Sequence, residues 1–73
     1  MNWQDHIEQL PDVMLGKPVF KGTRVPIRSL FDHLKAGDGL EVFLDDFPGV
    51  SREHVEAVLD LAQRGLLNGV RAA

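Results

Sequence analysis

The sequence has 73 residues, a formal net charge of −3 and no cysteine. A chain of this length forms one small domain, and the missing thiols exclude a disulfide framework, a thiolate zinc site and a cysteine nucleophile. No apolar run is long enough to span a bilayer, and the first ten residues carry two acids and no basic side chain, unlike a secretory signal. We therefore expect a cytoplasmic protein, and a homodimer, because small domains gain stability by association.

Charge is distributed unevenly along the chain. Residues 16–36 carry five basic side chains against one acid, whereas residues 37–60 carry seven acids against one basic side chain. A polyanion would bind the first segment and be repelled by the second. Any contact with nucleic acid should therefore come from the N-terminal half of the chain, or from two such halves in a dimer.

The first fifteen residues have no clear assignment. Trp3, Ile7 and Leu10 fit one face of a helix that Pro11 would end, and residues 13–15 fit a short extended segment. We treat residues 1–15 as a separate N-terminal segment.

The segment 16–27, GKPVFKGTRVPI, is rich in glycine, proline and basic residues. Apolar and β-branched residues on both sides of Gly22 predict two short strands or one bent strand, and Pro18 and Pro26 restrict them to the edge of a sheet. The glycines lack the Gly-Lys-Ser/Thr ending of a phosphate-binding loop. Nucleotide binding is therefore not expected.

Amphipathic helices are predicted after this segment. Pro26 suits the first turn of the first helix, and Gly37 closes that helix as a left-handed cap. Asp38 is the expected cap of the second helix, which Pro48 and Gly49 stop.

A third helix should begin after Ser51, its expected cap, and end at Gly65. Residues 66–73 then form a tail that is either frayed or ordered by a partner. The apolar stripes expected to face the core are Ile27, Leu30, Phe31 and Leu34 in the first helix, Leu40, Phe43, Leu44 and Phe47 in the second, and Val55, Val58, Leu59 and Ala62 in the third.

A short β element followed by these helices predicts a mainly α fold, a small three- to four-helix bundle whose second and third helices form a helix-turn-helix. The expected domain covers residues 16–65. In such a fold the third helix enters the DNA major groove, and Arg52 and His54 lie at the end that contacts bases. Glu53, Glu56 and Asp60 on the same helix would oppose the phosphates.

Catalysis and metal binding are not expected. His6, His33 and His54 lie on separate predicted elements and are most simply read as exposed histidines, so we expect no metal site and no cofactor. No base is arranged near a serine or threonine, and so short a chain leaves little room for a catalytic pocket. We expect that the protein is not an enzyme.

Segment 16–27, followed by DFPGVS at 46–51 and the pattern of Glu53, Val55, Ala57 and Leu59, resembles the domain-of-unknown-function family 433, a group of short prokaryotic proteins. The likeness covers about residues 10–63. It implies a homeodomain-like helix-turn-helix with a short N-terminal β element. It also implies a VapB-like antitoxin of a type II toxin–antitoxin system, which neutralises a PIN-like ribonuclease toxin and represses its own operon by binding promoter DNA.

This resemblance suggests three surfaces. An unpaired strand edge with apolar side chains invites pairing, and basic side chains from two copies would then meet phosphates. A flexible tail with an arginine would reach the carboxylates that hold metal in such a nuclease. The residues assigned are Lys17, Lys21, Arg24, Arg28, Arg52 and His54 to DNA, Val19, Phe20, Thr23 and Val25 to the dimer interface, and Leu66, Leu67, Val70 and Arg71 to the toxin.

Two alternatives stay open. The guanidinium of Arg24 is equally suited to bind backbone carbonyls or Asp46. The whole chain could also be a protein-interaction module that keeps the helix-turn-helix as a scaffold, uses its acidic half for docking and does not bind DNA.

Overall fold

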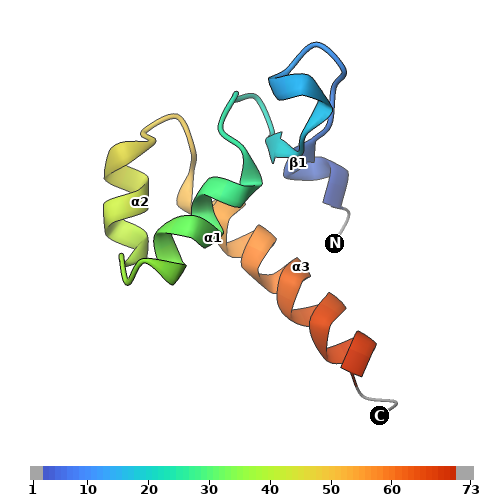
Figure 1. Ribbon diagram of the computed structural model, residues 1–73, viewed down its shortest axis with the longest axis vertical. Helices are drawn as coiled ribbons and strands as arrows, with labels where there is room; N and C mark the ends of the chain where they lie inside the picture. Colours follow the sequence, from blue (N-terminus) through green and yellow to red (C-terminus); the bar gives the residue numbers. More distant parts are fainter. Residues whose placement is uncertain (1–2, 71–73) are drawn as a thin grey trace.

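The structure is a computed structural model, and it describes residues 3–70. It confirms the mainly α fold, because within this range α1 (Ile27–Lys35), α2 (Leu40–Asp46) and α3 (Arg52–Val70) follow a short two-stranded β element. The turn 47–51 joins α2 to α3 in helix-turn-helix order. Figure 1 shows α1 between α2 and α3, the strands to one side, and the second half of α3 extending away from the rest.

Strand β2 (Val19–Phe20) is held on both sides. On one side it pairs antiparallel with β1 (Ile7–Glu8), with Ile7 opposite Phe20. On the other side Val19 forms a bridge with Pro26, and the N–H of Phe20 donates to the carbonyl of Val25 over 3.0 Å. The prediction of a free edge at this strand is therefore wrong, because its partner strand comes from the N-terminal segment.

The N-terminal segment folds back onto the helices. A short 3-10 helix, η1 (Trp3–Asp5), precedes β1, and a second one, η2 (Met14–Gly16), replaces the extended segment expected at 13–15. The helical spacing of Trp3, Ile7 and Leu10 was misleading, because Ile7 is fixed by pairing with a strand a dozen residues downstream. Local periodicity carries no information about such a partner.

Two predicted helix caps are confirmed. Gly37 has a φ of 91°, and the N–H of Asp38 donates to the carbonyl of His33 over 3.0 Å, the hydrogen bond that closes a Schellman motif. At the start of α3 the N–H of His54 donates to the hydroxyl of Ser51 over 3.1 Å.

Two other predicted caps are wrong. Helix α2 begins one residue later than expected, so Gly39 and not Asp38 occupies its N-cap. Helix α3 continues past Gly65 as far as Val70, so most of the expected tail is helical. An interior glycine is tolerated in a helix at a cost of about 1 kcal/mol, which is why sequence alone could not separate it from a cap. None of the described helices is long and apolar enough to cross a membrane.

The core forms where the three helices meet β2. Phe20 packs against Phe43 with ring centroids 5.9 Å apart. Each predicted stripe contributes at least one buried residue, namely Leu30 in α1, Phe43 in α2, and Val55 and Val58 in α3. Ala62 is an exception and is exposed, because it lies on the part of α3 that extends from the body. The buried apolar residues are Val19, Phe20, Leu30, Phe43, Val50, Val55, Ala57 and Val58.

Two glycine substitutions test these helix boundaries. Gly65→Ala should raise the free energy of unfolding by about 0.5–1 kcal/mol, because alanine favours a helix interior. Gly37→Ala should lower it by about 1–2 kcal/mol, because the φ of 91° places this residue in the left-handed region. Urea denaturation followed by circular dichroism measures both. A destabilising Gly65→Ala would contradict a continuous α3.

Candidate functional site

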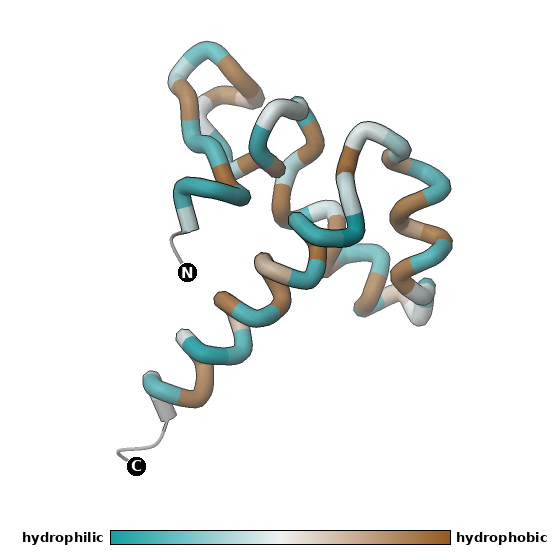
Figure 2. Tube along the Cα trace, turned by 180° about the vertical axis from the view of Figure 1, so that it is seen from behind, coloured by the Kyte–Doolittle hydropathy of each residue, from teal (hydrophilic) through white to brown (hydrophobic). Residues whose placement is uncertain are grey.

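The end of α3 presents an apolar surface. Leu66 is 67% exposed and Leu67 is 55% exposed, and we call these two residues the leucine tip. Figure 2 shows the hydrophobic stretch near the free end of the helix, where no other described segment lies beside it. Two of the four residues predicted to bind a toxin are therefore displayed together. The side chain of Val70 and all of Arg71 lie outside the described residues.

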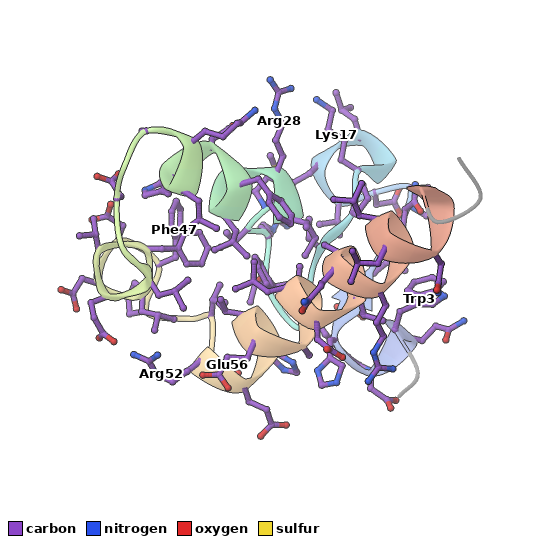
Figure 3. All side chains as sticks on the ribbon, turned by 90° about the horizontal axis from the view of Figure 1, so that it is seen from below. Trp3, Lys17, Arg28, Phe47, Arg52 and Glu56 are labelled. Atoms are coloured by element: carbon purple, nitrogen blue, oxygen red, sulfur yellow. The ribbon has the colours of Figure 1, made fainter. Side chains whose placement is uncertain are left out.

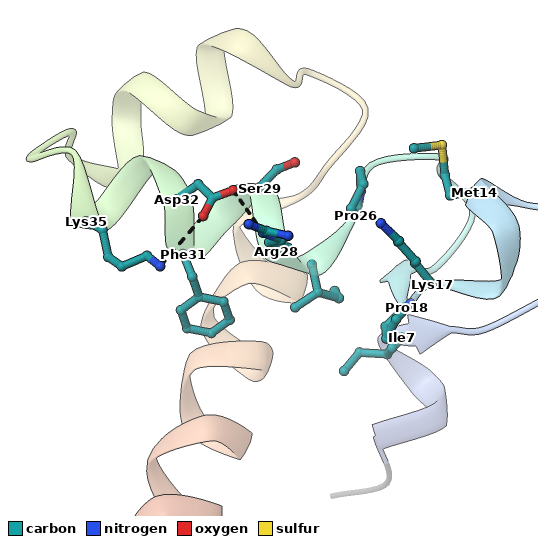
Figure 4. A pocket seen from close by; sticks show the side chains of 11 residues that line it. Ile7, Met14, Lys17, Pro18, Pro26, Arg28, Ser29, Phe31, Asp32 and Lys35 are labelled. Atoms are coloured by element: carbon teal, nitrogen blue, oxygen red, sulfur yellow. Dashed lines mark ion pairs between the residues drawn. The ribbon is translucent and has the colours of Figure 1, made fainter.

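A groove of about 650 Å³ lies between α1 and the segment that contains η2 and β2. Figure 4 shows its two walls, with Arg28 and Phe31 on α1 facing Lys17 and Ile7 across the opening. We call it the basic groove. We use the word floor for its apolar lining residues and the word rim for its polar lining residues. The floor consists of Ile7, Met14, Pro18, Pro26, Ile27 and Phe31, and the rim of Lys17, Arg28, Ser29, Asp32 and Lys35.

The structure brings together only two of the six residues predicted to bind DNA. Lys17 and Arg28 share the basic groove, which also gains Lys35, a residue that was not predicted. Figure 3 shows Lys17 and Arg28 on one side of the molecule and Arg52 on the opposite side. Lys21 is turned away to donate to the carbonyl of Gln4 over 3.2 Å.

Two other residues predicted to contact DNA lie outside the basic groove: Arg52 is held in ion pairs, and Arg24 is exposed. Arg52 pairs with Glu41 on α2 and lies 3.9 Å from Glu56 on its own helix. Arg24 is exposed and makes no ion pair within residues 3–70, so its predicted contact with Asp46 is not formed. The third helix therefore offers no cluster of cations to a phosphate backbone.

The α3 face expected to read bases is acidic. A hollow of about 540 Å³ at the start of this helix is lined by Glu53, Glu56 and Asp60, together with His6, Arg52 and Ala57. His54 is drawn toward the N-terminal segment, where its Nδ1 lies 2.8 Å from the Nδ1 of His6. Within residues 3–70 no three histidine or carboxylate side chains gather closely enough to hold a metal ion.

The residues predicted for a dimer interface belong to the protein's own hairpin. Val19 and Phe20 are 1% and 0% exposed, so their side chains cannot contact a second copy. The Thr23 hydroxyl donates to the carbonyl of Phe20 over 2.8 Å and accepts the N–H of Val25 over 3.0 Å. Val25 packs against the core. A homodimer stays a prediction, and the side chains of Val19 and Phe20 are not available to its interface.

The histidines are not the exposed side chains that the sequence suggested. His33 is 22% exposed, its Nδ1 donates to the carbonyl of Ser29 over 2.9 Å, and its Nε2 donates to Asp46 over 3.2 Å. Its ring also meets Phe43 and Phe47 edge-on, at centroid distances of 5.4 and 5.5 Å. Both nitrogens can donate only in the imidazolium form. The bond to Ser29, and then the bond to Asp46, raise the pKa of His33 above 6.5.

This pKa shift predicts a pH-dependent stability. A pKa raised in the folded state stabilises the fold fully below the usual value of 6.5, and the contribution is lost as the pH rises through the folded-state pKa. We therefore expect the urea midpoint of the wild type, relative to that of His33→Gln, to fall as the pH is raised above 6.5. Asp46→Asn should retain part of the effect. A constant difference between wild type and His33→Gln across this range would contradict the prediction.

A family model and one curated relative match the chain. A family model described as "Protein of unknown function (DUF433)" matches residues 7–62, most of the chain. The uncharacterized protein y4eO of Sinorhizobium fredii (strain NBRC 101917 / NGR234) is 33% identical over 61 residues, which is 84% of this chain and 28% of the relative. The chain thus spans little more than a quarter of that curated relative's length. No solved structure matches the chain.

Proposed function

The chain belongs to the DUF433 family, and from this premise we propose that it is the antitoxin of a type II toxin–antitoxin system. In this role it binds and neutralises a PIN-like ribonuclease. The leucine tip is the observation that carries the proposal, because two adjacent leucines lie more than half exposed on a helix end without neighbours. Exposed apolar surface of this kind is typical of a protein contact.

The amino-acid composition at the end of α3 supports a helix end that becomes fully ordered when a partner binds. Gly65, Asn68 and Gly69 are poor helix formers, and each glycine costs about 1 kcal/mol relative to alanine. Helical turns of low intrinsic stability become ordered when a partner buries their apolar side chains. In this proposal the toxin covers Leu66 and Leu67, and Arg71 beyond them offers its guanidinium to the metal-binding carboxylates of the nuclease.

Growth rescue tests this function. If the neighbouring gene encodes the PIN-like ribonuclease of this proposal, co-expression of the chain with that gene product should restore growth. The double variant Leu66→Asp/Leu67→Asp should abolish both rescue and co-purification, because carboxylates in an apolar contact are uncompensated. Asn68→Asp, an exposed charge in the same turn, is the matched control and should rescue fully. Aspartate is unfavourable near a helix C-terminus, so both variants should lose a little helical circular dichroism at this end, and Asn68→Asp controls for that loss.

Failure of the wild-type chain to rescue growth or to form a complex would refute the antitoxin proposal. Full rescue by Leu66→Asp/Leu67→Asp would refute the role of the leucine tip while leaving the activity itself standing.

Repression of its own operon is the second part of the proposal. Three observations favour the alternative in which no DNA is bound. The expected recognition face of α3 is acidic, Arg52 is paired with Glu41, and His54 contacts His6. A protein-interaction module on a helix-turn-helix scaffold fits these contacts without a DNA step.

The salt dependence of promoter binding distinguishes a DNA-binding repressor from a protein-interaction module. If promoter DNA is bound through the basic groove, the logarithm of the binding constant should fall linearly with the logarithm of the salt concentration, and Lys17→Ala/Arg28→Ala should make the slope shallower by about 1.8 for each chain bound. Fluorescence anisotropy of a labelled promoter duplex measures this slope. Binding that is absent, or unaffected by salt, would favour the interaction module.

A further inference from the structure

We propose that the basic groove binds an acidic peptide segment of a partner protein and seats an apolar side chain of that segment on its floor. The groove is lined by residues 7–35, whereas the leucine tip lies at residues 66 and 67. The two surfaces are separate, and this inference does not rest on the proposed antitoxin function.

The net positive charge of the rim indicates that the bound peptide is acidic. Lys17, Arg28 and Lys35 stand around the groove against the single carboxylate of Asp32. Asp32 is 3.5 Å from Arg28 and 3.8 Å from Lys35, but both basic side chains are about four-fifths exposed. Exposed ion pairs of this kind are weak and exchange partners readily. The rim therefore presents an excess of positive charge to an incoming carboxylate, and a bound peptide needs at least two acids to match it.

The floor of the groove selects a peptide over a nucleic acid. Phe31 and Ile7 come from opposite walls, as Figure 4 shows, and Ile27, Pro18 and Pro26 add to the apolar lining. A volume of about 650 Å³ lies in the range of ligand-binding pockets. A phosphate backbone would leave this apolar surface uncovered, and single-stranded nucleic acids are bound by successive aromatic side chains. Within the lining Phe31 is the single aromatic residue.

The loop that forms the outer wall supplies a second apolar contact. Met14 lines the groove with a φ of 48°, and the next residue, Leu15, has a φ of 58° and is 92% exposed. Non-glycine residues rarely adopt this left-handed conformation, and a strained backbone is retained where it serves a site. In the free chain Leu15 gains nothing from burial. Leu15 follows the lining residue Met14 but does not itself line the groove, so a peptide that extends past Met14 would cover it.

Peptide selection, followed by binding measurements on charge-reversal variants, tests the proposal. A phage library of random twelve-residue peptides is panned against the full chain, and enriched peptides are synthesised with a fluorescent label. We expect them to carry acids beside an apolar residue, and to bind at least about tenfold more weakly to Lys17→Glu/Arg28→Glu at low salt. Arg24→Glu is the control, because this exposed cation lies outside the groove lining. It reverses one charge where the groove variant reverses two, and it should change affinity by less than about threefold.

Leu15→Asn separates the role of the loop from that of the fold. Asparagine tolerates the left-handed region better than leucine does, so this variant should unfold at higher urea concentration while binding the selected peptides more weakly. A purely structural role for Leu15 would instead leave peptide affinity unchanged. Unchanged affinity would remove the loop from the site.

Several results would overturn the proposal. These are the absence of any enriched peptide, enrichment of peptides without acids, or an equal loss of affinity in Arg24→Glu and Lys17→Glu/Arg28→Glu. A labelled twenty-nucleotide DNA, single-stranded or duplex, is measured in parallel. If it binds more tightly than every selected peptide and perturbs the amide resonances of residues 26–35, the groove is a nucleic-acid site instead.

Discussion

The contact between Phe20 and Phe43 joins the β element to the helices. Both side chains are fully buried, and their rings are tilted at 49° with centroids 5.9 Å apart. Phe20 lies on β2, which carries β1 on one side and leads through Pro26 into α1 on the other. Fixing this one ring against α2 therefore sets the N-terminal segment opposite α1. Both walls of the basic groove depend on that placement.

The fold separates the two halves of the charge pattern into two faces. Lys17 and Arg28 project on one side, while the start of α3, with its acids and with Arg52 already paired, projects on the other. A protein with a net charge of −3 that gathers three of its eight basic side chains beside an apolar floor is better matched to a mixed acidic and hydrophobic ligand than to an extended polyanion. The leucine tip adds an uncharged surface at a third location.

The sequence was sufficient for the features that depend on near neighbours. Leu30, Phe43 and Val55 were identified as core residues because helical periodicity is local, and the caps at Gly37 and Ser51 were identified for the same reason. Family membership could also be inferred from the motif residues, and the match to residues 7–62 confirms it.

The features that were missed depend on distant pairs. Nothing in the local pattern of Ile7 indicates that Phe20 lies opposite it, and the contacts of His6 with His54 and of His33 with Asp46 span 48 and 13 residues. For this reason the sequence alone predicts a free strand edge, exposed histidines and one basic surface, and the structure differs from each prediction. The groove was missed as well, since its walls come from segments that meet only in the folded chain.

Residues 3–18 form the N-terminal wall of the basic groove, and the way this wall is attached affects how long a ligand stays bound. The three helices are joined by short turns and share one core. Residues 3–18 are held by the β1–β2 pairing, by the packing of Ile7 against the core, and by a few hydrogen bonds, such as the one of 2.7 Å from Gly22 N–H to Glu8. Segments with few buried contacts open locally without global unfolding. We therefore expect amide hydrogens of β1 to exchange with solvent faster than those of α1 and α3. Capture of a ligand between the walls would then be governed by the rate at which this segment detaches and reseats, and not by the stability of the helical core.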